Sequence, residues 1–305
     1  MSSSAVSVGA GIAMLGSANM DLVFSVERIP SPGETLLATK TARYPGGKGL
    51  NQAVAAARAG ATTTFLGALG DDEHGRELAS VMAEAGIDGR LVRRSAAPTG
   101  QAFIMVDSRA ENAIVVASGA NATVTGLGDE ECRAIASSRL LLMQLELPMA
   151  VVEQAAAAAR EAGVTVVLNA APAQPLDARL LAGLDCLIVN EHEACLIGGS
   201  DDLGAASASL AAQVALLIVT LGGEGSVLYQ DGGELARIPA PRVPVVDTTG
   251  AGDTFCGAFA AALAEGRSPV DAARFATAAA ALSVQTLGAV PSIPHRAEID
   301  ASLGG

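Results

Sequence analysis

Four short apolar runs decide the fold: LLLMQ at residues 140–144, VTVVLN at 164–169, CLIVN at 186–190 and ALLIVT at 215–220. Each run has the length of a strand, and none alternates with polar residues, so each is expected to be buried on both faces. Residues 149–162 and 203–212, which lie between the runs, have helix-forming composition. The sequence therefore predicts a doubly wound, mostly parallel α/β sheet flanked by helices, to which IAMLG at 12–16 adds a strand.

A different texture appears at about residues 21–43 and 99–118, where short half-polar runs are joined by polar or Pro/Gly turns. Half-exposed strands have this pattern. We predict that the two segments form a small β sheet, which projects as a lid from a single domain spanning residues 1–305. No linker and no internal repeat divides the chain.

Composition excludes several classes of protein. The 305 residues are 50% hydrophobic and 17% charged, as in globular proteins. The net charge of -13 repels nucleic acids and anionic lipid surfaces, although backbone dipoles and metal ions still permit a local phosphate site. The four cysteines form no C-x-x-C pair, which indicates reduced, buried thiols. Since neither a signal peptide nor a membrane span is apparent, we expect a cytoplasmic protein.

The segment VDTTGAGDTF at 246–255 joins a β-prone run, PRVPVV, to a helical stretch at 255–264. Its small residues allow a phosphate to approach the free N–H groups of a helix N-terminus, where partial positive charge stabilises anions. Asp253 lies beside these groups and is placed to accept a proton from an attacking hydroxyl. The alternative is a helix-capping aspartate.

Polar residues at other loop positions are candidates for ligand binding. YPGGKGLNQ at 44–52 precedes a helical stretch and presents the Lys48 ammonium and Asn51 amide, unless it is an ordinary surface turn. Asn19 and Asp21 follow the first predicted strand, and Glu146 follows another. Ligands of α/β sheets bind at such carboxyl ends, although Asx residues there also form turns.

Several common catalytic motifs fail. Gly49 follows Lys48, which excludes a Walker A loop, and the glycines near 250 do not match the dinucleotide fingerprint. The three histidines are scattered, which makes a histidine metal site improbable, and no G-x-S-x-G elbow occurs.

Together these segments resemble the PfkB carbohydrate kinase family, and within it the ribokinases, over nearly the whole chain. The matching stretches, in chain order, are GSANMD at 16, IPSPGET at 29, GGKGLNQAVAAARAGA at 46, GDDEHG at 70, MQLELP at 143, NAAPA at 169, NEHEACLIG at 190, VTLGGEG at 219, DTTGAGDTF at 247 and GAVPSIP at 288. The resemblance implies an α/β sandwich with a β lid, a homodimer formed through that lid, and ATP-dependent phosphorylation of the D-ribose 5-hydroxyl.

The resemblance also implies roles for individual residues. Asp253 corresponds to the general base of the family, and Gly250, Ala251 and Gly252 correspond to its anion hole. The sugar-binding set corresponds to Asn19, Asp21, Gly47, Lys48, Asn51, Glu146 and Asp253. The residues implied for ATP are Asn190, Glu193, Thr220, Gly222, Gly225, Gly252 and Thr277, of which the first two would organise Mg²⁺ and phosphates. A potassium site is implied at Asp247, Thr249, Ser283, Thr286, Gly288 and Ser292.

Two positions depart from the family pattern. Leu50 replaces a frequent alanine and either narrows the sugar pocket or packs into the core, and Thr277 replaces a histidine of some members. The open alternatives are another PfkB kinase, acting on 2-deoxyribose, a ketohexose, a 2-keto-3-deoxy sugar acid or a nucleoside, and a non-catalytic sugar-binding module.

Overall fold

A nine-stranded sheet forms the centre of the protein in a computed structural model that describes residues 11–109 and 112–304. The N-terminal stretch MSSSAVSVGA and residues 110 and 111 of the predicted lid lie outside the described residues. The strand order is β13-β12-β11-β10-β9-β8-β1-β4-β5. Neighbouring strands from β11 to β5 in this order pair parallel, whereas the β11–β12 and β12–β13 pairs are antiparallel. The strands are β1 Gly11–Leu15, β4 Thr62–Gly70, β5 Val92–Ser95, β8 Leu140–Met143, β9 Thr165–Asn169, β10 Cys186–Asn190, β11 Leu216–Thr220, β12 Ser226–Gln230 and β13 Gly233–Ile238.

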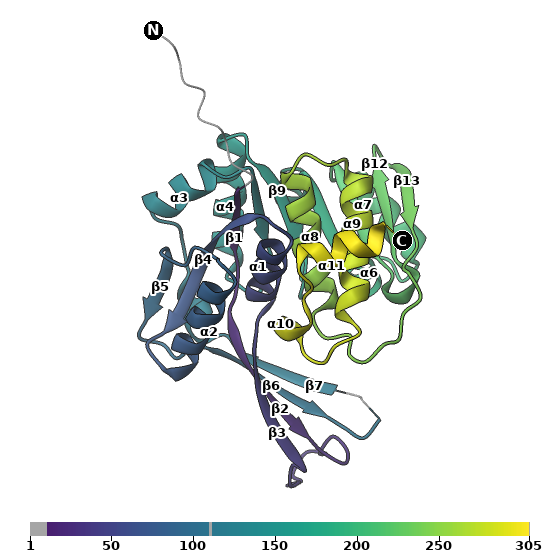
Figure 1. Cartoon of the computed structure of the whole chain (residues 1–305). Coiled ribbons are helices and arrows are strands. Elements are labelled where there is room, and N and C mark those ends of the chain that lie inside the picture. Colours follow the sequence, from purple (N-terminus) through teal and green to yellow (C-terminus); the bar gives the residue numbers. More distant parts are fainter. Residues whose placement is uncertain (1–10, 110–111, 305) are drawn as a thin grey trace.

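Helices cover both faces of this sheet (Figure 1). Within β1, Ile12 and Met14 pack into one hydrophobic cluster, whereas Ala13 and Leu15 pack into the other. This alternation explains why the central strands are continuously apolar, and the predicted doubly wound fold is confirmed. One cluster contains residues of α1 Lys48–Arg58, α2 Glu73–Glu84, α8 Ala251–Ala264, α9 Pro269–Ser283, α10 Ala289–Ser292 and α11 Arg296–Leu303. The other contains residues of α3 Asp129–Ala136, α4 Met149–Glu161, α5 Ala178–Leu181, α6 Glu191–Gly198 and α7 Leu203–Ala211.

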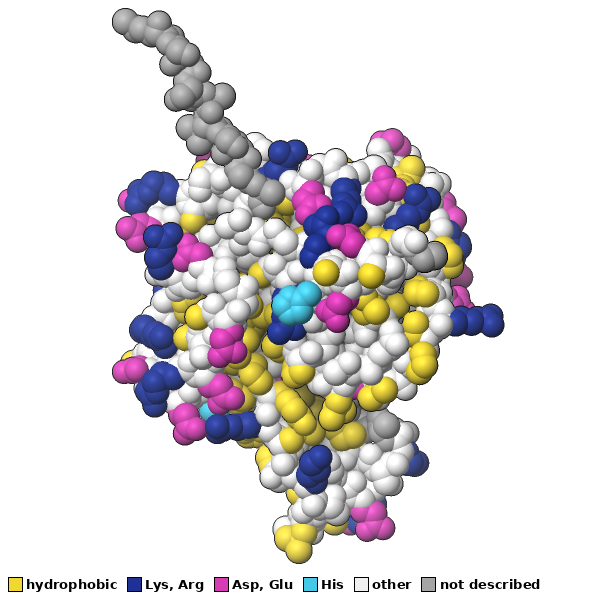
Figure 2. Space-filling view, viewed as in Figure 1, with side chains coloured by type: hydrophobic (Ala, Val, Ile, Leu, Met, Phe, Trp, Pro, Cys, Tyr) yellow, Lys and Arg dark blue, Asp and Glu magenta, His cyan; other side chains and the backbone are white. Residues whose placement is uncertain are grey.

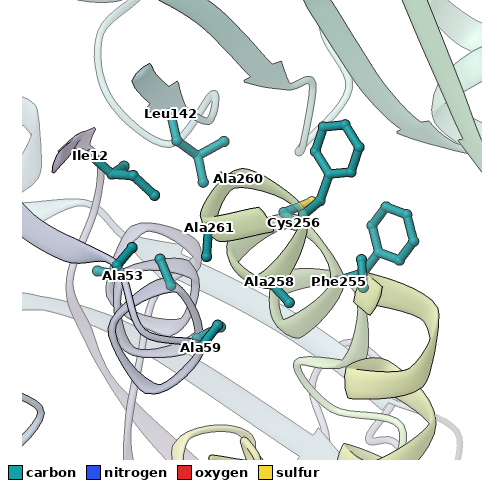
Figure 3. Close-up of a cluster of buried hydrophobic side chains, with 14 of the residues drawn as sticks. Ile12, Ala53, Ala59, Leu142, Phe255, Cys256, Ala258, Ala260 and Ala261 are labelled. Carbon is teal, nitrogen blue, oxygen red and sulfur yellow. The ribbon is translucent and has the colours of Figure 1, made fainter. Parts of the chain in front are cut away.

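Helices α1 and α8 pack against each other through small residues, as the alanines of Figure 3 show. A Cβ atom on Gly257 of α8 would lie 2.3 Å from the backbone oxygen of Gln52 and 2.5 Å from the Cβ of Ala55. The two backbones therefore approach too closely for any larger side chain at position 257. This packing fixes the position of the loop before α1 relative to the loop before α8.

The predicted lid is a four-stranded sheet that projects from one end of the body (Figure 1). Its order is β3-β2-β6-β7, in which β2 pairs parallel with β6 and the other pairs are antiparallel. The strands are β2 Asn19–Ser25, β3 Lys40–Gly46, β6 Gly100–Val106 and β7 Asn112–Ala117. The β-like run after Glu34 becomes a strand only at Lys40, because residues 35–39 lie in an exposed irregular loop.

Two expectations from the sequence are corrected. The β-prone run at 241–246 forms no strand, because Pro241 and Pro244 have no N–H to donate to a sheet. The four cysteines are free as expected, but only Cys186 and Cys256 are buried; the other two are half-buried.

Figure 2 shows acidic and basic side chains interspersed over one face of the molecule. In the part of the chain that the structure describes, no helix is both long and apolar enough to cross a bilayer.

Candidate active site

Asp253 is the third residue of α8 and is only 8% exposed. Its Oδ2 accepts a hydrogen bond from Asn51 Nδ2 at 2.9 Å, and its Oδ1 accepts one from Gln52 Nε2 at 2.9 Å. The residue before the helix is Gly250, so the interpretation of Asp253 as a helix cap is wrong. A buried carboxylate with two donors and unused lone pairs has the geometry of a general base.

The N-terminus of α8 leaves N–H groups beside this carboxylate. Gly250 has a left-handed conformation, with φ 75°, and starts the helix. The N–H of Ala251 donates to Thr248 O at 3.2 Å, whereas within residues 11–109 and 112–304 the N–H groups of Gly252 and Asp253 meet no acceptor. Gly252 is exposed, and a Cβ placed on it would have no neighbour within 4 Å. An anion can therefore reach the two free N–H groups.

The loop before α1 is tied to the end of β8. Gly47 has φ 91°, and a Cβ there would lie 2.7 Å from the backbone nitrogen of Asn19, so glycine is required. Glu146 Oε2 accepts hydrogen bonds from the Lys48 N–H at 3.1 Å and from the Ser17 hydroxyl. These bonds bring the predicted residues Gly47, Lys48, Asn19 and Glu146 together.

Lys48 is half-buried and faces three carboxylates, so its interpretation as a solvated surface lysine is wrong. Burial disfavours the charged ammonium, but the Asp253, Glu146 and Glu193 carboxylates outweigh burial and raise the pKa of Lys48 above its ordinary value. Lys48 therefore remains protonated and compensates the charge of these carboxylates.

Asn19 and Asp21 lie in strand β2, not in a turn. Asn19 Oδ1 accepts a hydrogen bond from Asn121 Nδ2 at 2.7 Å. Asp21 packs over Gly46, where a Cβ would lie 2.1 Å from Asp21 Oδ2. Burial, followed by the charges of Glu146 and Asp253, raises the pKa of Asp21 to about 7.

The raised pKa of Asp21 makes stability depend on pH. Because this pKa of about 7 exceeds the ordinary 3.8, the contribution of Asp21 is fully present below about pH 4 and is lost as the pH rises through 7. Asp21→Asn carries no charge, so at pH 8 we expect the ligand-free variant to be roughly 2–4 kcal/mol more stable than the parent. Urea unfolding at pH 5 and pH 8 measures this gain, which should shrink at pH 5; an equal difference at both would contradict the assignment.

A cleft of about 140 Å³ opens where Asp253 and Lys48 meet the carboxyl ends of β9, β10 and β11. Glu193 is 8% exposed and forms a reciprocal capping pair with Asn190, so the interpretation of a solvated glutamate is wrong. Burial raises the pKa of Glu193. Predicted and unpredicted residues line this cleft together: Lys48, Asn169, Ala171, Ile188, Asn190, Glu193, Thr220, Gly250, Gly252, Asp253 and Cys256.

Comparisons with known proteins identify the family. The model of the pfkB family carbohydrate kinases matches residues 10–296. The chain belongs to the PfkB carbohydrate kinase family. The ribokinase of Haemophilus influenzae is 44% identical over 295 residues, which cover 94% of this chain and 96% of that protein. Arabidopsis thaliana ribokinase complexed with ribose and ATP superposes with a TM-score of 0.91 and 35% identity, and covers 97% of this chain and 99% of that chain. Thermotoga maritima ribokinase has a TM-score of 0.88 and 37% identity, with 96% and 99% covered.

The remaining residues predicted to bind ATP in this PfkB kinase do not all line one cleft. Thr220 lines the 140 Å³ cleft, whereas Thr277 lines a separate cleft of about 520 Å³ beside Val243 and Ala281. Thr277 Oγ1 is buried and has no hydrogen-bond partner among the described residues. Gly222 and Gly225 follow β11 and line neither of these two clefts.

The residues predicted for potassium lie in two segments of the kinase, 247–249 and 283–292, which a hydrogen bond between Gly288 and Asp247 joins. Asp247 Oδ1 accepts hydrogen bonds from the N–H and the hydroxyl of Thr249, and its Oδ2 accepts one from the Gly288 N–H at 2.8 Å. Partial burial acts to raise the pKa of Asp247, but these bonds together outweigh it and lower the pKa below its ordinary value. None of the described residues donates to the carbonyl oxygens of Asp247, Thr249 or Thr286. Carbonyl oxygens are ligands that suit K⁺, so the donor set fits the ion. Ser283 and Ser292 lie in the same region, but their hydroxyls donate to Ala280 O and Ala289 O.

Leu50 packs into the core of the kinase. It is fully buried in the same hydrophobic cluster as α8. Of the two alternatives from the sequence, the structure therefore supports core packing, and Leu50 provides no reason to expect a narrowed sugar pocket.

Sequence reasoning missed polar residues that support the site: Ser17, Gln52, Asn121, Gln144 and Asn169. Asn169 ends β9 and Gln144 follows β8, so the carboxyl-end position that identified Glu146 would have identified both. Gln52 lies within a helix and carries no comparable signal.

Proposed function

We propose that this protein transfers the γ-phosphoryl group of ATP to the 5-hydroxyl of D-ribose, giving ribose 5-phosphate and ADP. The observation that carries the proposal is the position of Asp253, which lies between the predicted sugar set and the free N–H groups of α8. The 44% identity to a ribokinase supports ribose as the acceptor, and the likeness to a ribokinase complexed with ribose and ATP supports both ligands.

The reaction requires a deprotonated hydroxyl and compensation of negative charge. In our proposal Asp253 accepts the proton of the 5-hydroxyl, whose oxygen then bonds to the γ-phosphorus as the bond to the leaving ADP oxygen breaks. The N–H groups at the start of α8 bind the transferring phosphoryl oxygens, and the Lys48 ammonium offsets the surrounding carboxylates. The Asn51 Oδ1 is buried and unpartnered among the described residues, so it is free to accept a hydrogen bond from a sugar hydroxyl.

Magnesium and the nucleotide are assigned to the β10 end of the cleft. Asn190 and Glu193 line it, and Glu193 keeps one carboxylate oxygen that takes no part in the capping pair. Mg²⁺ usually takes one or two protein carboxylates with phosphates and waters, so this donor set fits Mg²⁺. When bound, the ion would neutralise phosphate charge. The larger cleft beside Thr277 is proposed to hold the base of ATP, and a related ribokinase from Cryptococcus neoformans is known in complex with ADP.

The experiment that tests this function is coupled ADP release with Mg-ATP against ribose, 2-deoxyribose, fructose and adenosine, each in sodium and in potassium buffer. We expect the highest kcat/KM on ribose, because a missing or misplaced hydroxyl leaves a buried polar partner unpaired. Activity should rise with potassium if the 247–249 and 283–292 loops bind it. Turnover only on another acceptor would contradict the ribose assignment, and no turnover on any acceptor would favour a binding role.

We further propose a homodimer that forms through the lid. The edge strand β7 exposes Ile114, Val115 and Val116 at 52%, 62% and 47%, and Phe103 on β6 is 38% exposed. Exposed apolar side chains gathered on one small sheet are typical of a protein interface. Sedimentation velocity should give a dimer mass for the parent and a monomer mass for Val115→Glu; a monomeric parent would contradict the proposal. The cytoplasmic location remains a prediction.

A further inference from the structure

We propose that Gln52 is the positioning residue of the base, and that a chain of buried side-chain amides fixes the orientation of the Asp253 carboxylate. The proposal rests on the function proposed above, in which Asp253 accepts the hydroxyl proton. Gln52 and Gln144 do not line the 140 Å³ cleft, whereas Asp253, Asn169 and Ile188 do.

Gln52 lies at the centre of the amide chain. Its Nε2 donates to Asp253 Oδ1 at 2.9 Å and to Asn169 Oδ1 at 3.0 Å. Its Oε1 accepts from Gln144 Nε2 at 2.7 Å. Gln52 is fully buried, and Asn169 and Gln144 are 7% and 1% exposed. Every polar atom of the Gln52 amide is therefore used, away from solvent.

A backbone carbonyl sets the direction of this chain. Asn169 Nδ2 donates to Ile188 O at 3.1 Å, and a carbonyl oxygen only accepts. Asn169 must therefore turn its own oxygen toward Gln52, so that the NH₂ group of Gln52, not its oxygen, faces Asp253. The opposite orientation would place the Gln52 oxygen against the acceptors Asp253 Oδ1 and Asn169 Oδ1, and the Gln52 NH₂ group against the NH₂ group of Gln144.

Asn51 and Gln52 hold the two oxygens of Asp253 in different ways. Asn51 belongs to the predicted sugar set, and its unpartnered Oδ1 leaves it free to respond to the sugar. Gln52 is locked by Gln144 and Asn169. Gln52 therefore keeps Asp253 Oδ1 occupied whether or not sugar is bound, which directs the lone pairs of Oδ2 toward the hydroxyl.

The test compares Gln52→Leu and Gln52→Glu with the parent protein, using ribose and Mg-ATP. Hydrogen bonds to charged groups contribute enough for a loss of about 10- to 100-fold in kcat for Gln52→Leu, with the KM for ATP within about twofold of the parent value. Removing a donor from a carboxylate favours its protonation, so the acidic limb of the kcat profile should move up by about one pH unit. Gln52→Glu keeps the shape but sets a second carboxylate against Asp253, and kcat should fall further.

The matched control is Thr63→Val in β4, which removes a buried hydroxyl that donates to Ala61 O. It should leave kcat and the acidic limb unchanged. Gln144→Met removes the donor that holds Gln52 Oε1, together with its weaker contact to Met14 Sδ. It should shift kcat and the acidic limb in the same direction as Gln52→Leu, but by less. It also keeps the test decisive if the Gln52 variants do not fold. An unchanged kcat and acidic limb in folded Gln52→Leu, or in Gln144→Met if neither Gln52 variant folds, would overturn the proposal.

A second readout does not depend on activity. Crystal structures of the parent and Gln52→Leu should show the Asp253 carboxylate in one orientation in the parent and in a rotated or divided orientation in the variant. If the parent fails to phosphorylate ribose, the proposed function falls, whereas the carboxylate orientation still decides the positioning role. The same single orientation in both structures would overturn that role.

Discussion

Asp253→Asn is expected to lower kcat for ribose phosphorylation by about a thousandfold or more, since general base catalysis contributes roughly 10²–10⁴-fold and the variant side chain cannot accept the proton in the same way. The substitution also replaces one acceptor oxygen by an NH₂ group. That NH₂ group faces the amide of Asn51 or of Gln52, each of which donates a hydrogen bond to Asp253 in the parent. The two effects act in the same direction. Steady-state ADP release at saturating ribose and ATP measures kcat directly.

The matched control for this variant is Asp271→Asn. Asp271 is also the third residue of its helix, α9, but it is exposed and its carboxylate contacts Ser268 and Arg274. Its substitution should leave kcat within about twofold of the parent value, because a substitution on the surface rarely changes a distant site. If Asp253→Asn keeps more than a tenth of the parent kcat, Asp253 is not the base.

Lys48→Met is expected to lower kcat/KM for ribose by roughly a hundredfold to a few thousandfold. Removal of one preorganised charge or donor from a reacting centre typically costs about 10²–10³-fold in rate, because the remaining charges lose their compensation. The Lys48 ammonium lies near the Asp253, Glu146 and Glu193 carboxylates, and its charge opposes the effect of burial on the pKa of Glu193, so its loss makes protonation of Glu193 easier. The acidic limb of kcat/KM should therefore move to higher pH.

The control for this prediction is Lys40→Met, which removes the same charge from an exposed position on lid strand β3. It should leave both kcat/KM and the pH profile near the parent values. An unshifted acidic limb in Lys48→Met, with a small loss of kcat/KM, would show that Lys48 does not compensate the carboxylates.

Much of the fold follows from local pattern. The central strands were predicted because their burial on both faces removes polar alternation, and Ile12 and Ala13 show this by packing on opposite faces of the sheet. The pairing of β2 with β6 is different, since its partners are about 80 residues apart and no local signal specifies their register. The run at 241–246 was mispredicted because its valines suggest a strand while Pro241 and Pro244 prevent one.

Part of the candidate site could also be predicted from the sequence, and the rest depends on tertiary packing. Glu146 was predicted because carboxyl ends of parallel strands converge at one edge of the sheet, and Asn190 because the family resemblance implied it. In the structure Glu146 follows β8 and Asn190 ends β10. The partial burial of Lys48 and the use of the Gln52 amide depend on how closely α1 packs against α8, which is a property of tertiary structure. Leu50 shows the same limit, because only packing distinguishes a core residue from a pocket residue.

The central claim is transfer of phosphate to the 5-hydroxyl of ribose, and ³¹P NMR of the reaction product tests it most directly. Ribose, Mg-ATP and the parent protein in potassium buffer should give one new phosphomonoester signal, split by the two hydrogens on C5. A signal split by the single hydrogen on C1, or no new phosphomonoester while ATP persists, would contradict the account.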